Sequence, residues 1–123
     1  MGYRVTMHSD WIHVEYLEQV DSLDIVEQAS DESFRKALAD KRKVMYDYTH
    51  ATKVSLNEDA LKELATLGKF HGSLHDRIDV AVIVFTKAGL EKARIYKNAT
   101  SNSCWHVELF QSFTKAKDWL VAQ

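Results

Sequence analysis

Polar side chains that could bind a ligand follow two stretches of the chain that are predicted to be strands. They are Asp47, Tyr48, Thr49, His50, Thr86 and Lys87. Parallel sheets bind ligands outside the carboxyl ends of their strands. Asp47 could orient the imidazole of His50, and Lys87 would lie at a helix N-terminus, where anions are favoured. We therefore predict a site for a small polar ligand or a partner loop at this edge of the sheet.

The same residues also have an ordinary structural interpretation. Asp47 and Thr49 are typical of residues that satisfy loop amides, and Thr86 is typical of a helix cap. Ser55 is three residues before Glu58, which is the spacing of a capping box at the start of a helix. Ser55 belongs to the predicted ligand or partner site because it follows the same strand. Both interpretations of these residues stay open at this point.

Two other pairs of residues have spacings that could support chemistry. His71 and His75 have the i, i+4 spacing of zinc ligands on a helix, but Gly72 interrupts the helix and the glutamate of H-E-x-x-H is missing. Cys104 and His106 would share one face of a strand, but a catalytic pair also needs a group that orients it. We therefore predict no catalytic residue, no metal site and no cofactor.

Length and composition restrict the class of protein. A chain of 123 residues, 46% of them hydrophobic, is typical of a single domain, here residues 1–123. The 16 basic and 18 acidic residues give no strong field for nucleic acid, so no nucleic-acid partner is expected. The longest apolar run, Val80–Phe85, is far shorter than the roughly 20 residues of a membrane span. A lone cysteine and the lack of a signal-peptide pattern favour the cytoplasm.

Hydrophobic patterns predict the strands that must position the candidate site. Alternation of apolar and polar residues indicates a hairpin at the start of the chain and an edge strand near its end. The continuous run Val80–Phe85 is rich in β-branched residues, as expected for a strand covered on both faces. The strands are predicted at residues 3–8, 11–17, 44–48, 80–85 and 104–110.

Capping residues and helical spacing predict the segments between the strands. Helices are expected to begin at residues 21–22, 55, 86 and 112, and the stretch 22–39 is either two short helices or one bent helix. The resulting order is ββαβαβαβα. This order predicts an α/β fold with a five-stranded mixed sheet and about four helices.

Several segments also share a pattern with a known family. They are Asp47-Tyr48-Thr49 at a strand end, Ala81-Val82-Ile83-Val84 in a strand, Ala93-Arg94-Ile95-Tyr96 in a helix, and Phe110 followed by Ala116-Lys117-Asp118-Trp119-Leu120. The chain resembles the small bacterial SpoIIAA-like proteins, an uncharacterised branch related to the STAS domain, over nearly its whole length. The resemblance implies a STAS-like fold and a non-enzymatic regulatory or protein-interaction role. A protein partner or a homodimer would follow from that role.

The phosphorylation switch of STAS antagonists is not carried over with the resemblance. Those proteins are phosphorylated on a serine in an Asp-Ser-x-Gly turn, and the matching segment here, residues 50–58, has neither the Asp-Ser pair nor the glycine. Ser55 lies nearby in a capping-box position.

The fold also resembles half of the lipid-binding CRAL-TRIO domain.

Three classes of function therefore remain after the sequence is considered. The first is a cytoplasmic regulatory or interaction module. The second is a carrier or sensor of a small molecule or lipid that uses the crevice at the strand ends, and it should show a cavity of several hundred Å3. The third is an enzyme centred on Asp47 and His50, which should show a cleft with a strongly perturbed titratable group.

Overall fold

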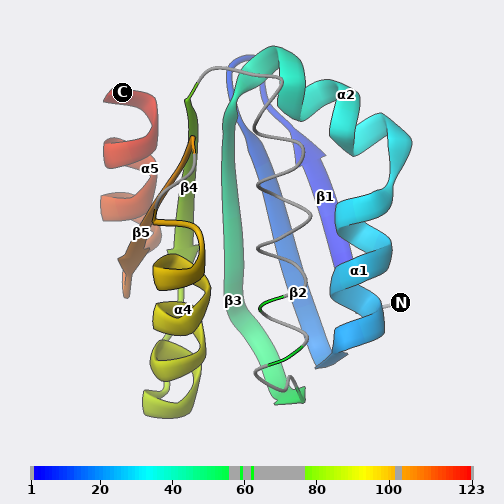
Figure 1. Ribbon diagram of the computed structural model, residues 1–123, viewed down its shortest axis with the longest axis vertical. Helices are drawn as coiled ribbons and strands as arrows, with labels where there is room; N and C mark the ends of the chain where they lie inside the picture. Colours follow the sequence, from blue (N-terminus) through cyan, green and yellow to red (C-terminus); the bar gives the residue numbers. More distant parts are fainter. Residues whose placement is uncertain (1, 56–58, 60–61, 63–76, 102–103, 123) are drawn as a thin grey trace.

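The computed structural model describes residues 2–55, 59, 62, 77–101 and 104–122. The described residues form an α/β fold with one mixed sheet in the order β1-β2-β3-β4-β5 (Figure 1). The strands are β1 (Tyr3–Met7), β2 (Ile12–Asp21), β3 (Lys43–Ser55), β4 (Ile78–Ile83) and β5 (Trp105–Phe110). The helices are α1 (Ser22–Ser30), α2 (Glu32–Lys41), α4 (Lys87–Ala99) and α5 (Phe113–Ala122). The fold class predicted from the sequence is confirmed.

The sheet combines one antiparallel pair with three parallel pairs. β1 and β2 form the predicted hairpin, and β2, β3, β4 and β5 run parallel to one another. β4 lies between β3 and β5, and all six of its residues are buried. The run Val80–Phe85 predicted an inner strand, and both faces of β4 are covered; the strand itself is Ile78–Ile83, and Phe85, beyond its end, is exposed. β5 lies at the sheet edge, as predicted.

Helices cover the two faces of the sheet unequally. The larger core joins the sheet to α1, α2 and α4 through Ile25, Phe34, Leu38 and Ala93. The smaller core joins the opposite face to α5, where Ala116 and Leu120 pack with residues of β3 and β4. α5 contacts mainly β3, β4 and β5. The part of this second face that belongs to β1 and β2 lies outside those main contacts.

Asp31 separates the two helices that follow β2. Its backbone is extended, and its side chain accepts the N–H of Phe34 at 2.8 Å, so it caps α2 directly after α1 ends. Asp21 caps α1 in a reciprocal capping box with Asp24. Of the two alternatives left open by the sequence, two short helices are therefore observed, because each has its own N-terminal cap.

β2 and β3 are both longer than the sequence pattern predicts. Their pairing continues to Asp21 and Ser55 through two register shifts, and Glu18 adopts a positive φ of 56° beside the second shift. Each shift adds one residue on β3, as in a β-bulge. The bulges interrupt the alternation of apolar and polar residues, so the pattern stops at residue 48 although the strand does not. Ser55 is the last residue of β3; of the helix expected after it, the structure describes only residues 59 and 62, and both are helical.

No helix in the described part of the chain is both long and apolar enough to cross a membrane.

Candidate functional site

The predicted strand-end residues do not form one cluster. Tyr48, Thr49 and Thr86 line a cavity on the face of the sheet that carries α1, α2 and α4. Asp47 lies on the other face with His13, although its second partner, Thr49, lines the cavity. His50, Ser55 and Lys87 are exposed and are not among the described residues that line the cavity. Alternation along β3 separates Asp47 from Tyr48, and the register shift that follows Asp47 interrupts the alternation at Thr49.

The cavity has a volume of about 730 Å3 and lies between the sheet and the three helices. The sheet contributes side chains of β2, β3 and β4, and each of α1, α2 and α4 contributes residues to the wall. Most of the described wall is apolar or aromatic. Binding sites for small molecules have volumes of roughly 300–1,000 Å3 and are lined mainly by such side chains. The cavity is therefore large enough for one small ligand.

Four tyrosines line the cavity, three of them on the sheet. Tyr16 of β2 stacks on Tyr48 of β3 with ring centroids 4.9 Å apart, and Tyr46 lies 6.3 Å from Tyr16. Tyr96 of α4 also lines the cavity. Burial raises the pKa of all four phenols above the usual value. The hydroxyls therefore stay protonated at neutral pH and can donate hydrogen bonds.

Gln28 supplies an unsatisfied polar group to this wall. Its side chain is only 1% exposed, and its Oε1 accepts a hydrogen bond from the Tyr16 hydroxyl at 3.3 Å. Its Nε2 has no hydrogen-bond partner among the described residues. Turning the amide over would leave the oxygen without a partner instead. A buried polar group without a partner costs about 1–3 kcal/mol, and such a group is commonly satisfied by a bound water, ion or ligand.

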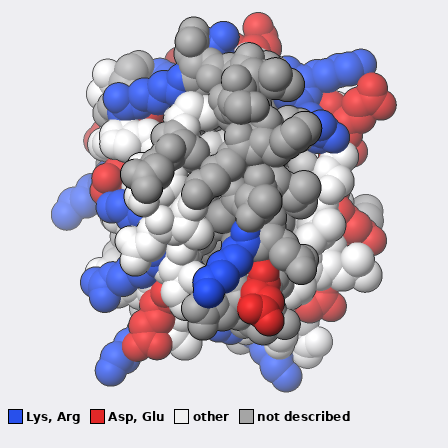
Figure 2. Space-filling view, viewed as in Figure 1, with Lys and Arg blue, Asp and Glu red and all other residues white. Residues whose placement is uncertain are grey.

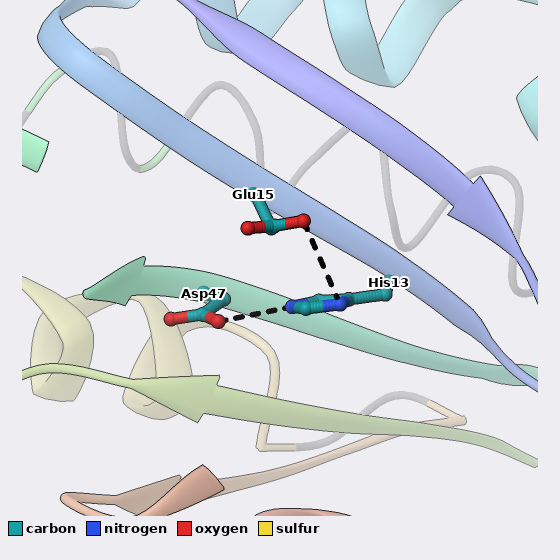
Figure 3. Close-up of side chains that lie close together, drawn as sticks. All are labelled: His13, Glu15 and Asp47. Carbon is teal, nitrogen blue, oxygen red and sulfur yellow. Dashed lines mark hydrogen bonds and ion pairs between the residues drawn. The ribbon is translucent and has the colours of Figure 1, made fainter. Parts of the chain in front are cut away.

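A separate polar cluster lies on the opposite face of the sheet (Figure 3). The Nε2 atom of His13 lies 2.9 Å from the Oδ2 atom of Asp47, and its Nδ1 atom lies 3.9 Å from the Oε1 atom of Glu15. All three side chains are largely buried. His13 and not His50 is therefore the imidazole that Asp47 orients, because Asp47 and Glu15 are register partners on β3 and β2.

Asp47 is held in its ionised form by its neighbours. Burial by itself would raise the pKa of this carboxyl, but hydrogen bonds from His13 and from the hydroxyl and amide of Thr49 lower the pKa overall. Oδ1 accepts the Thr49 N–H at 2.9 Å and also the Thr49 hydroxyl. The role predicted for Asp47 as an acceptor for backbone amides is therefore observed.

The cluster could offer three ligand atoms to a divalent cation. One atom each from His13, Glu15 and Asp47 lies within 4.8 Å of the others, and imidazole with carboxylates is a donor set that zinc accepts. Glu15 already receives Arg4, whose Nη2 atom lies 3.0 Å from both carboxylate oxygens. The described contacts therefore satisfy this cluster through its own charges and hydrogen bonds.

The remaining pairs from the sequence do not form sites among the described residues. His106 contacts Arg77 and lies 3.5 Å from Asp79, so its ring is engaged near the start of β4. Cys104, the single cysteine of the chain, is half-buried and precedes β5. The candidate zinc pair, His71 and His75, lies outside the described residues.

Gln28 and His13 were missed by the sequence analysis, although both left a signal. Gln28 lies at i+3 from Ile25, within the apolar stripe of α1, where a polar residue is unexpected. His13 alternates with Ile12 and Val14 on β2, so it had to lie on the face opposite the main core. Its pairing with Asp47 depends on strand register, which one strand's pattern cannot reveal.

Comparisons with known proteins concern the fold. No family model matches the chain, and no curated protein matches it. A crystal structure of an uncharacterized protein from Shewanella loihica PV-4, of the DUF3478 family with a SpoIIAA-like fold, matches with a TM-score of 0.60 and 18% sequence identity. The match covers 96% of this chain and 91% of that chain. The chain therefore has a SpoIIAA-like fold, as the resemblance in its sequence implied.

Proposed function

We propose that the protein binds a small, mainly apolar ligand in the cavity between the sheet and α1, α2 and α4. The observation that carries the proposal is a cavity of about 730 Å3 with a mainly apolar described wall, which includes Gln28, whose buried Nε2 has no partner among the described residues. A buried donor that lacks an acceptor destabilises the empty protein, and a ligand oxygen would remove that cost. This is the carrier or sensor role that the sequence left as the second class of function.

The composition of the wall favours binding over catalysis. The described lining residues include no histidine, cysteine, aspartate or glutamate, and their lysines and tyrosines are the groups that could transfer protons. The His13–Asp47 pair lies on the opposite face of the sheet and does not reach the cavity lining. The resemblance to STAS domains supports a regulatory role, and a ligand-binding cavity is compatible with a sensor in such a role.

Filling the cavity with a side chain tests the proposal. Ala29 lines the cavity and is half-buried, so Ala29→Phe would place a ring in the space that a ligand needs. Titration with the neutral fluorescent dye Nile red should give saturable binding to the natural protein. We expect Ala29→Phe to weaken that binding about tenfold or more, since each 1.4 kcal/mol of lost contact is about tenfold in affinity.

Ala122→Phe is the matched control, because it adds the same ring at an exposed position near the end of α5. Circular dichroism and urea unfolding would show that both variants fold. If Ala29→Phe does not fold, Ala51→Phe makes the same test from β3. Absence of saturable dye binding, or equal binding by natural protein and the folded cavity variant, would refute the proposed function.

A further inference from the structure

The charged side chains that line the cavity are all of one sign among the described residues. The described lining residues include the cations Arg35, Lys53 and Lys92 and no carboxylate. This differs from the chain as a whole, which has 16 basic and 18 acidic residues. Figure 2 shows basic and acidic side chains mixed over the described surface on the same side of the molecule. The positive wall is therefore a local feature of the cavity.

Lys92 is the most enclosed of the three cations. It is half-buried on α4, whereas Arg35 and Lys53 are exposed. Its Nζ atom donates a long hydrogen bond of 3.5 Å to the carbonyl of Val54. No carboxylate of a described residue forms an ion pair with it, in contrast to Lys97, which lies 3.4 Å from Glu108. A partly desolvated ammonium without a carboxylate partner favours an anion nearby.

The N-terminal end of α4 adds to the positive potential of the same wall. Thr86, Ala88 and Gly89 line the cavity at the first turn of this 13-residue helix. The hydroxyl of Thr86 accepts the N–H of Gly89, so the cap itself is satisfied. The helix dipole still places partial positive charge at this end. The free Nε2 of Gln28 is an independent observation, and it requires an acceptor.

We infer that the ligand is a single-chain amphiphile with an anionic head group, either a carboxylate or a phosphate monoester. This inference rests on the proposed function. The head group pairs with the cationic part of the wall where Lys92 contacts the carbonyl of Val54 beside Lys53, and the N–H of Gln28 offers a second polar contact in the wall. The aromatic and aliphatic wall holds the tail. Charges act over longer distances in an apolar cavity than in water, so the cations need not touch the head group.

Three probes of equal tail length separate the head group from the tail. Dodecanoate, dodecyl phosphate and dodecanol, each below its critical micelle concentration, would compete with Nile red for the natural protein. We expect at least one anion to bind about tenfold more tightly than dodecanol. The tighter of the two anions identifies the head group as a carboxylate or a phosphate.

A charge-removing variant tests the role of the cations. Lys92→Gln should reduce the affinity for the preferred anion about fivefold and leave the affinity for dodecanol unchanged. Arg94→Gln is the control, because it removes one positive charge from the exposed side of the same helix. Its affinities should equal those of the natural protein.

The outcomes distinguish this inference from the proposed function. If dodecanol binds as tightly as both anions, or if Lys92→Gln and Arg94→Gln behave alike, the anionic head group is refuted and the cavity remains a binding site. If neither the dye nor any of the three probes binds, the proposed function fails as well.

Discussion

A single amide at position 28 gives the cavity its chemical character. Gln28 is part of the apolar stripe of α1; an apolar residue of similar size there would remove the unpartnered Nε2 but would leave the hydroxyl of Tyr16 without its acceptor. Natural proteins rarely keep a buried donor without an acceptor unless the group has a use. On the opposite face, Asp47 shows the contrasting case, because its carboxylate is fully supplied with donors.

Asp47 should make the stability of the protein depend on acidic pH. Its pKa is lowered in the folded state, so the unfolded chain binds more protons than the folded one as the pH falls through about 4. The contribution of Asp47 is therefore present at neutral pH and is lost in acid. We expect Asp47→Asn to lower the free energy of unfolding by about 1–3 kcal/mol at neutral pH, where the charged hydrogen bonds are lost.

Urea unfolding at neutral pH and near pH 3 measures this effect. The difference between Asp47→Asn and the natural protein should shrink in acid. Asp118→Asn removes a carboxylate from an exposed position on α5 and serves as the control. An Asp47→Asn variant whose stability falls in acid as steeply as that of the natural protein would contradict the assignment.

Among the elements, the α1–α2 pair positions Gln28 over the sheet. α1 ends at Ser30, and the Asp31 cap starts α2 at once. Ile25 of α1 and Phe34 and Leu38 of α2 all join the main core, and both helices line the cavity.

Removing the cap of α2 should destabilise the protein by a moderate amount. We expect Asp31→Ala to lower the free energy of unfolding by about 1 kcal/mol, because the N–H of Phe34 loses its acceptor. Asp31→Asn keeps a side-chain acceptor and should cost only a fraction of that amount. Urea denaturation of the two variants checks the difference, and equal stabilities would show that the cap has no such role.

Local patterns predicted the elements better than they predicted the site. β4 was identified because both of its faces are buried, and α4 because Thr86 caps it. The far half of β3 was missed because its bulges break the alternation. The tyrosine wall and the His13–Asp47 pair arise from β2–β3 register, which depends on both strands together.

The whole molecule is a sheet with two unequal sides. The side with three helices contains the cavity, and the other side is packed by α5 alone among the described helices (Figure 1). Ligand binding to the folded state alone would stabilise the whole protein by an amount that grows with the logarithm of ligand concentration. Occupation of the cavity by a ligand and the stability of the whole protein are therefore linked.

The free energy of unfolding of Tyr16→Phe/Gln28→Leu, measured with and without the tighter-binding of dodecanoate and dodecyl phosphate, shows whether a ligand completes the Gln28 amide. The two changes replace a buried polar pair by apolar groups, which is nearly neutral or stabilising when no ligand is present. We predict that the anion raises the unfolding free energy of the natural protein, and that the double variant equals or exceeds the empty natural protein and responds weakly. A double variant less stable than the empty protein, with an undiminished response to the same anion, would contradict ligand binding at Gln28.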